Sequence, residues 1–469
     1  MGSFVGRSAE LAALNEHLDQ VRGSGEGRFL SVRGRRQVGK SRLIEEFLGQ
    51  AGVPSIFFTA TKSASPDEEL RSFARDVQES SLEAAPLFAE VDFQGWEPML
   101  RLLAAHVKVP TIAAIDELPF LVEGDPSLEG VLQKVWDRQL SRVPVLLIVV
   151  GSDLSMMEAL GSYDRPLYQR MREMVVEPLN PAEVGEALHA QAADAFEAYL
   201  VIGGFPRLVA EWGAATSVDR FLRRQFTDTT SPLVVVGERI LNAEFPPGVQ
   251  ARDVLRLIGS GETTFADIAA RSGLNQGSLT RALQVLAQQK RVVAVERPLA
   301  ARRTRLTQYR IADPYLRFWL RFVGPNIELL LRGRGADVAD RVRKAWPAYR
   351  GKAVEPVVRA SLERLLPDER FGAAQYVGSY WSRTADTEVD LVGGSGPEAP
   401  TAVEFVGSVK WRERAVFDRR DLAGLATARA RVPGADEALL VGVSKSGFST
   451  VELDVALGPD DLLRGWERS

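Results

Sequence analysis

A glycine-rich loop between a short apolar run and an amphipathic segment constrains the fold of this chain more than any other feature of its sequence. The loop, GRRQVGKS, extends from Gly34 to Ser41, after the apolar run 28–32 and at the start of segment 40–48, whose apolar residues recur at helical spacing. Glycine, four residues, glycine, lysine and serine between a strand and a helix form the pattern of a phosphate-binding P-loop. The pattern predicts an α/β domain built on a parallel sheet.

The residue types in the loop suit a triphosphate. Glycines let successive backbone amides curl around phosphate oxygens, and the helix dipole adds positive charge. We expect Lys40 to pair with the β and γ phosphates of ATP and the Ser41 hydroxyl to ligate Mg²⁺. A plain glycine-rich turn before a helix is the alternative. The predicted nucleotide-binding residues here are Gly34, Arg35, Arg36, Gln37, Val38, Gly39, Lys40, Ser41 and Arg42.

Polar residues follow two further apolar runs. Asp116 and Glu117 end the run 111–115, and we expect Asp116 to hold Mg²⁺, directly or through water, and Glu117 to act as the catalytic base. Ser152 follows the run 143–150 and is a candidate to hydrogen-bond the γ phosphate or the attacking water. Capping of the helices that follow is the alternative role for all three.

Composition narrows the classes of protein to which this chain can belong. With 469 residues the chain is too long for one core and predicts about three folding units, and 45% apolar with 26% charged residues is typical of globular proteins. The absence of cysteine excludes disulfides and thiolate chemistry, and the three histidines show no metal-ligand spacing. No export signal or membrane span is indicated, so we expect a cytoplasmic protein with no membrane partner.

Several segments together resemble the archaeal-type AAA ATPases, which are also widespread in bacteria and related to the signal-transduction ATPases of the STAND type. The resemblance covers nearly the whole chain. In chain order the segments are FVGRSAEL at 4–11, the P-loop, IDELPFL at 115–121, GSDLSMMEAL at 151–160, PLYQR at 166–170 and GGFPRLV at 203–209.

This resemblance implies roles for residues outside the P-loop. Val5, Gly6 and Arg7 would lie near the adenine, and Pro206 would close over the base from a small helical lid. Arg170 would contact the γ phosphate in its own or a neighbouring subunit. Arg172 competes for that role, and an ordinary surface charge is the alternative for both arginines.

A helix-turn-helix pattern lies in the middle of the chain. Helices are expected at 250–258, 264–272 and 276–289, and strands at 292–295 and 307–311 would complete a winged helix. Residues 249–311 hold eleven Lys and Arg against four Asp and Glu, a net charge of +7 that favours double-stranded DNA as a partner.

The predicted DNA contacts divide between base edges and phosphates. We expect Gln276 and Arg281 at base edges, and Arg302, Arg303 and Arg305 at the wing tip on phosphates. The alternative is a regulatory winged helix that presses on the nucleotide domain. The aromatic segment 311–323 that follows is expected to pack between domains.

The end of the chain is similar to PD-(D/E)XK nucleases, in which an Asp and a Glu-X-Lys bind Mg²⁺ and orient water. The segments that carry this similarity are the helix around Glu355, VGSYWSR at 377–383, EVDLV at 388–392 and VGSVKW at 406–411. Asp390 and Lys410 occupy two of the three places, but Ser408 stands where the Glu belongs. Glu404 lies about 20 Å from Lys410 along an extended strand. We therefore predict a degenerate site with weak or absent cleavage, unless Glu355 supplies the missing carboxylate.

These features predict a multidomain α/β protein. It would contain a P-loop ATPase domain at 1–178, a helical lid at 179–245, a winged helix at 246–312, a helical linker at 313–345 and a nuclease-like domain at 346–469. The favoured function is ATP hydrolysis coupled to DNA engagement or to assembly, as a homo-oligomer or with a protein partner. A slow STAND-like switch with an autoinhibitory winged helix and an ATP-regulated nuclease are the alternatives.

Overall fold

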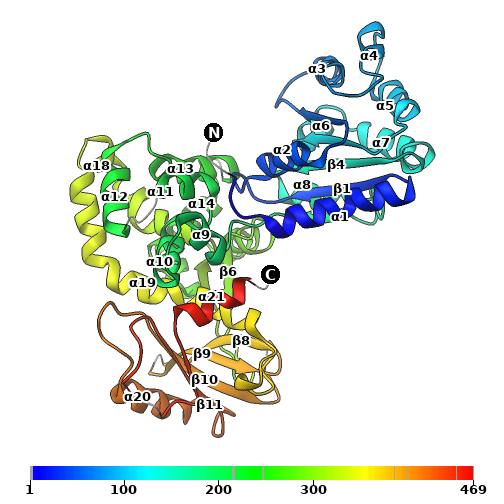
Figure 1. Cartoon of the computed structure of the whole chain (residues 1–469). Coiled ribbons are helices and arrows are strands. Elements are labelled where there is room, and N and C mark those ends of the chain that lie inside the picture. Colours follow the sequence, from blue (N-terminus) through cyan, green and yellow to red (C-terminus); the bar gives the residue numbers. More distant parts are fainter. Residues whose placement is uncertain are drawn as a thin grey trace. The chain divides into compact units, whose positions relative to one another are not determined.

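The computed structural model describes residues 4–213, 217–245, 248–384, 386–397, 399–449 and 452–467. The chain divides into two compact units, Met1–Pro178 and Leu179–Ser469. Figure 1 shows the elements of each unit, coloured along the sequence.

The first unit is built on a five-stranded sheet in the order β2-β3-β4-β1-β5, and each strand pairs with its neighbour in parallel. Its strands are β1 (Arg28–Arg33), β2 (Ser55–Thr59), β3 (Thr111–Asp116), β4 (Val145–Gly151) and β5 (Arg172–Val175). Its helices are α1 (Ser8–Ser24), α2 (Lys40–Ala51), α3 (Pro66–Gln78), α4 (Leu87–Glu90), α5 (Trp96–His106), α6 (Leu118–Gly124), α7 (Leu128–Arg138), η1 (Leu140–Arg142) and α8 (Leu154–Leu160). The predicted parallel-sheet α/β domain is thus confirmed.

The central strands of this sheet consist mainly of apolar residues and are covered by helices. β3 and β4 are buried along their whole length, as unbroken apolar runs in a parallel sheet require. β1 pairs with β4 so that Arg33 lies opposite Gly151, and β3 pairs with β4 so that Ile115 lies opposite Val149. This register brings the carboxyl ends of β1, β3 and β4 to one edge of the sheet.

The second unit combines a helical region with a mixed sheet in the order β12-β11-β10-β9-β8. β8, β9 and β10 pair antiparallel, whereas β10, β11 and β12 pair in parallel. The strands of this sheet are β8 (Tyr376–Trp381), β9 (Glu388–Gly394), β10 (Val403–Lys410), β11 (Leu439–Ser444) and β12 (Val455–Leu457). The helices beside it are α19 (Gly335–Leu365), η5 (Glu369–Phe371), α20 (Arg419–Arg429) and α21 (Pro459–Glu467).

Short helices precede the long helix α19, which runs without a break across the predicted boundary at 345–346. They are α9 (Pro181–Leu188), α10 (Ala192–Ile202), α11 (Pro206–Trp212), α12 (Val218–Thr227), α13 (Pro232–Glu244), α14 (Gln250–Ser260), α15 (Phe265–Ser272), α16 (Gln276–Gln284), η2 (Val285–Gln289), α17 (Pro314–Phe318), η3 (Trp319–Val323), η4 (Gly324–Asn326) and α18 (Ile327–Leu331). In the aromatic segment, Tyr315, Phe318 and Trp319 are buried.

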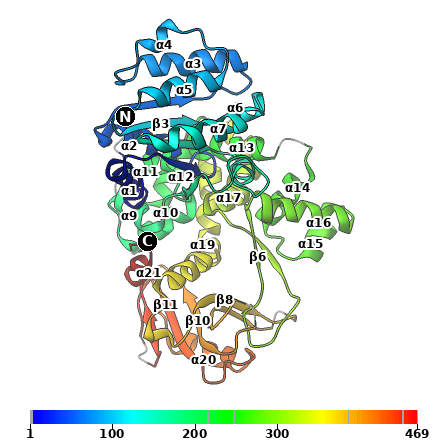
Figure 2. The same cartoon turned by 90° about the vertical axis from the view of Figure 1, so that its right-hand side faces the viewer.

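Two antiparallel strands, β6 (Val293–Glu296) and β7 (Gln308–Ile311), follow α14–α16. The loop between them is anchored on the C-terminal sheet: the Leu299 N–H donates to the Ser379 carbonyl at 2.8 Å and the Ala301 N–H to the Pro433 carbonyl at 3.0 Å. Leu299 is buried in an apolar cluster with residues of β9 and β10. Figure 2 shows this connection reaching from α14–α16 to β8. The loop is therefore part of the C-terminal core and not a free wing.

No helix in the described ranges combines the length and the apolar character needed to cross a bilayer.

Candidate functional site

The P-loop joins β1 to α2 with a tightly curled backbone. Gln37 and Gly39 have φ angles of 67° and 91°, in the left-handed region. A Cβ on Gly34 would lie 2.3 Å from the Val176 carbonyl oxygen, so glycine is required by close approach. The Lys40 side chain is buried in the curl, and its Nζ donates to the carbonyl oxygens of Gly34 at 2.8 Å and Arg35 at 3.0 Å. The lysine thus lies inside the loop, where a phosphate chain would replace the carbonyl contacts.

The two predicted magnesium ligands lie together. Asp116 at the end of β3 is 4% exposed and accepts a hydrogen bond from the Ser41 side chain at the start of α2. Burial and then the neighbouring Glu117 carboxylate raise the pKa of Asp116 against the opposing effect of Ser41. Mg²⁺ prefers one or two protein oxygens plus phosphate oxygens, which these two side chains fit. A cation here would offset the cost of burying the Asp116 charge.

The predicted base and the predicted sensor are hydrogen-bonded to each other. The Ser152 hydroxyl, beyond β4, donates to both carboxylate oxygens of Glu117, at 2.7 and 2.9 Å. Glu117 has a φ of 55°, which turns its side chain out of the strand direction at the start of α6. Sequence reasoning placed both residues at this edge but missed their mutual contact, because each was assigned directly to phosphate or water.

The residues that the family resemblance places near the adenine of ATP are found in both units. Val5 and Gly6 precede Arg7, which is buried and donates to the Val38 carbonyl at 2.8 Å, so the N-terminal segment is tied to the P-loop. Pro206 begins α11 in the second unit.

The arginine expected at the γ phosphate has a carboxylate partner of its own. Arg170 donates through Nε and Nη2 to the two carboxylate oxygens of Asp137, each at 2.8 Å. Its competitor Arg172 is exposed at the start of β5. A γ-phosphate contact by Arg170 stays a prediction and requires that it leave Asp137.

The predicted DNA-contacting residues are exposed. Gln276 and Arg281 lie on the outer face of α16, whose Leu279 and Leu283 pack inward. The β6–β7 loop also has exposed side chains, those of Arg302, Arg303 and Arg305. The backbone of the loop is held at Leu299 and Ala301, directly before these arginines.

The nuclease-like residues are partly assembled. Asp390 on β9 accepts through Oδ2 from the Ser408 hydroxyl at 3.0 Å and from the Val409 N–H at 2.8 Å. Glu355 on α19 is close enough that burial and the Asp390 carboxylate raise its pKa to about 7. Lys410 ends β10 and lines a small cavity together with Asp390 and Ser408. Among the described residues, no group of three or more carboxylate or imidazole side chains is arranged to hold a metal ion.

Glu404 lies elsewhere on the same strand. Its carboxylate accepts from the Ala373 N–H at 3.2 Å, away from Asp390, in keeping with the predicted separation along β10. Sequence reasoning missed Arg359, which donates to the Asp390 carbonyl at 3.2 Å and to Glu296. Its spacing of four residues from Glu355 on one helix was the available signal.

Known proteins match two parts of the chain. Residues 4–212 match a model described as an ATPase domain predominantly from Archaea, and residues 319–422 match one for archaeal and bacterial proteins of unknown function. The Uncharacterized protein MJECL04 of Methanocaldococcus jannaschii is 25% identical over 414 residues, which cover 87% of this chain and 88% of that protein.

Two solved structures are similar in part. The Walker-type ATPase PABY2304 of Pyrococcus abyssi is 19% identical with a TM-score of 0.48, over 68% of this chain and 96% of that one. The ORC2 protein of Aeropyrum pernix, in ADPNP and ADP complexes, is 14% identical with a TM-score of 0.41, over 71% of this chain and 95% of that one. By the match at residues 4–212, the first unit is similar to an ATPase domain predominantly from Archaea and has a five-stranded parallel sheet, and a separate mixed sheet follows in the second unit.

Proposed function

We propose that this protein binds Mg-ATP at the P-loop edge of the first unit and hydrolyses it. The observation that carries the proposal is that one sheet edge gathers a buried lysine in a curled loop, a hydroxyl on a buried aspartate, and a glutamate held by a serine. These are the groups that phosphoryl transfer to water requires: charge on the phosphates, oxygens for the cation and a base for the water. Mg²⁺ would supply charge neutralisation between the β and γ phosphates.

Three residues at this edge have separate roles in the proposed hydrolysis. Lys40 exchanges its two carbonyl partners for phosphate oxygens, which keeps its buried charge paired. Glu117 accepts the proton of the attacking water. Ser152 holds the Glu117 carboxylate by two hydrogen bonds and so fixes the direction from which it can accept that proton.

We further propose that turnover is coupled to duplex DNA bound by the second unit. The local net charge of +7 over 249–311 and the exposed outer face of α16 support this part. The slow switch with an autoinhibitory winged helix remains the competing interpretation of the same segment. The two differ in basal turnover and in the response to DNA.

The experiment is a steady-state ATPase assay of the full chain with and without duplex DNA at low salt. Coupling predicts that saturating DNA raises the rate several-fold, and that the DNA concentration needed increases with salt. An unchanged rate, with bound nucleotide found in the purified protein, contradicts coupling and supports the slow switch.

A second candidate activity is metal-dependent phosphodiester cleavage by the C-terminal domain. The proximity of Glu355 to Asp390 favours it, because Glu355 would replace the carboxylate missing at Ser408. Nicking of plasmid DNA that requires Mg²⁺ and disappears in both Asp390→Ala and Glu355→Gln would support this activity. Absence of nicking in the wild-type protein would contradict it.

A further inference from the structure

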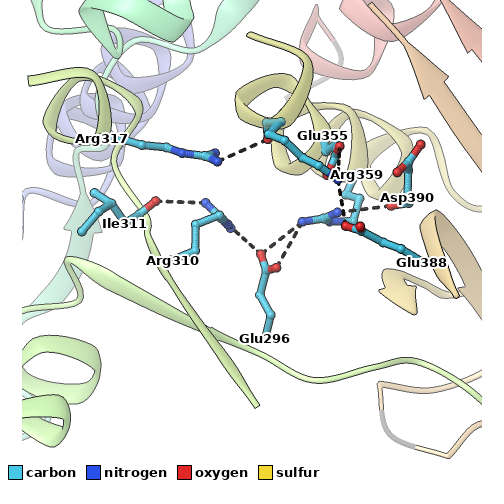
Figure 3. Close-up of polar contacts among 9 residues, drawn as sticks. Glu296, Arg310, Ile311, Arg317, Glu355, Arg359, Glu388 and Asp390 are labelled. Atoms are coloured by element: carbon cyan, nitrogen blue, oxygen red, sulfur yellow. Dashed lines mark hydrogen bonds and ion pairs between the residues drawn. The ribbon is translucent and has the colours of Figure 1, made fainter. Parts of the chain in front are cut away.

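A cavity of about 460 Å³ lies within the second unit, between β7, η3, α19 and the start of β9. Figure 3 shows the charged residues that line it, with Arg310 and Arg317 on one side and Glu355, Arg359 and Asp390 on the other. The cavity is of the size that holds small-molecule ligands, which is roughly 300–1,000 Å³. It lies far along the chain from the P-loop and uses none of its residues.

One side of the cavity has excess positive charge. Glu296 is the shared carboxylate of two arginines: it accepts from Arg310 Nε at 2.7 Å and from Arg359 Nη2 at 3.1 Å. In the part of the chain that the structure describes, Arg317 has no carboxylate partner and donates to the Lys352 carbonyl oxygen at 3.3 Å. Glu296 thus serves two arginines, and Arg317 adds a third guanidinium group to the cavity lining.

The pKa of Arg310 reflects the positive charge around it. Burial lowers the pKa of Arg310, Glu296 opposes that effect, and the nearby Arg317 and Arg359 guanidinium groups lower the pKa further. An anion placed among these three arginines would be stabilised by charge and by planar donors, a geometry that suits phosphate oxygens. Arg310 and Arg359 share Glu296, whereas Arg317 makes no ion pair among the described residues, so an anion beside Arg310 and Arg317 would supply the partner that Arg317 lacks.

The opposite side of the cavity has excess negative charge. Lys352 bridges Glu355 at 3.2 Å and Glu388 at 2.8 Å, and Asp390 lies beyond them. Three carboxylates therefore lie near one ammonium group and the Arg359 guanidinium group, which donates to the Asp390 carbonyl oxygen at 3.2 Å. Such a side accepts hydrogen bonds from hydroxyl and amino groups, as carboxylates do when they bind ribose.

Flat aromatic side chains complete the lining. Tyr309 and Trp381 line the cavity and are partly exposed, whereas Tyr380, the neighbour of Trp381 on β8, packs against the apolar cluster around Val389 on the other face of the sheet. Aromatic rings next to a positive groove give nucleobases a surface for stacking, at about 1–3 kcal/mol per base. Phosphate donors, hydroxyl acceptors and stacking surfaces thus lie within one cavity.

We infer that this cavity binds a nucleoside phosphate, with the phosphate on Arg310 and Arg317 and the base against Trp381. The ligand is either a free mononucleotide or the phosphorylated end of a nucleic-acid strand, since both present the same groups. The inference concerns the second unit and holds whether or not ATP is hydrolysed in the first. The phosphate half also does not depend on a metal at Glu355 and Asp390.

The test uses the full chain carrying Lys40→Ala, which removes nucleotide binding at the P-loop, in buffer with EDTA. The probes are thymidine 5′-monophosphate and a thymidine octamer with either a 5′-phosphate or a 5′-hydroxyl group. We expect calorimetry to detect binding of at least one phosphorylated probe. Tighter binding of the phosphorylated octamer assigns a strand end, and tighter binding of the monophosphate assigns a free nucleotide.

Two substitutions with opposite signs separate a binding role from a structural one. Arg317→Gln should weaken binding of the phosphorylated probe about tenfold. Glu296→Gln should strengthen it, because it removes the carboxylate that competes with phosphate for Arg310 and Arg359. Arg332→Gln, at an arginine whose side chain is 71% exposed, is the matched control and should change nothing.

Thermal unfolding of each variant shows whether it is folded. If Arg317→Gln does not fold, Arg317→Lys, which keeps the charge but has fewer donors, takes its place with a smaller expected loss. The inference is overturned if no phosphorylated probe binds at millimolar concentration. It is equally overturned if the Arg317 variant binds the tighter phosphorylated probe as well as its parent does, or if the 5′-hydroxyl octamer binds as tightly as the better of the two phosphorylated probes.

Discussion

The P-loop edge of the first unit and the charged cavity of the second unit differ in how they balance charge. At the P-loop edge each polar group has a partner: Lys40 donates to carbonyl oxygens of its own loop, Ser41 to Asp116 at the end of β3, and Ser152 to Glu117. In the cavity, Arg310 and Arg317 lie on one side, and Glu355 and Asp390 lie on the other with Arg359 beside them. Among the described residues, Arg317 has no carboxylate partner. The first arrangement keeps a site ordered before its ligand arrives, whereas the second leaves charge for a ligand to neutralise.

The sharpest test of the first region is Glu117→Gln. Removing the base while keeping its shape should leave Mg-ATP binding intact and lower turnover roughly a thousandfold. Single-turnover hydrolysis and calorimetry separate the two effects. Glu123→Gln, at an exposed position on α6, is the control, and retained turnover in Glu117→Gln would remove Glu117 from the role of base.

The unmatched charge of the second region is tested by pH. Glu355 has a folded-state pKa of about 7 against an ordinary value of 4.5, so the folded protein binds an extra proton between these pH values. Its contribution favours the folded state below pH 4.5 and is lost as the pH rises to 7, a change of about 3 kcal/mol in the free energy of unfolding.

Glu355→Gln should therefore stabilise the protein at pH 8 relative to pH 4.5, compared with wild type. Urea unfolding at both pH values gives the difference, and Glu369→Gln, at an exposed position, should leave the wild-type pH dependence in place. Identical pH dependence in wild type and Glu355→Gln would show that Glu355 ionises normally.

The basic loop between β6 and β7 is tested by salt. Replacing Arg302, Arg303 and Arg305 together by alanine should reduce the salt dependence of duplex binding by about three units of log K per log salt, and weaken binding roughly 30-fold at low salt. Electrophoretic shift assays over a salt series measure this. Triple replacement of Arg332, Arg334 and Arg343, exposed arginines of the same unit, is the control; an equal loss in both would mean that only total charge matters.

The smallest expected effect belongs to Ser152→Ala. Loss of the hydroxyl frees the Glu117 carboxylate from its fixed direction and should lower kcat about tenfold with little change in KM. Ser155→Ala, exposed on α8, should match wild type. A change in KM alone would indicate that Ser152 contacts nucleotide and does not position Glu117.

The two regions also differ in how far the sequence predicts them. The P-loop domain is predictable because each element of its site is local: a strand, a loop and a helix start within 28–48, and acids directly after a strand at 116–117. Those patterns predict the parallel sheet, which the structure confirms. The partnership of Glu117 with Ser152 was not predicted, because it depends on the order of β3 and β4 in the sheet.

The cavity was not predicted because its residues come from segments that tertiary packing brings together. No local sequence pattern contains the charged residues of the cavity. Each of them, taken alone, is typical of an ordinary surface charge: Glu296, Arg310, Arg317 and Arg359. The anchoring of the β6–β7 loop had a weak signal, since Leu299 and Ala300 interrupt a basic stretch with apolar residues. Their burial in the C-terminal core converts a predicted free wing into a fixed connection.

Calorimetric titration of Mg-ATP into the full chain tests the central claim most directly. The account predicts one saturable binding event at the P-loop that is lost in Lys40→Ala and retained in Lys134→Ala, whose lysine pairs with Glu97 on the surface. Folded, nucleotide-free protein that gives no heat with Mg-ATP, or a Lys40→Ala variant that binds as wild type does, would contradict it.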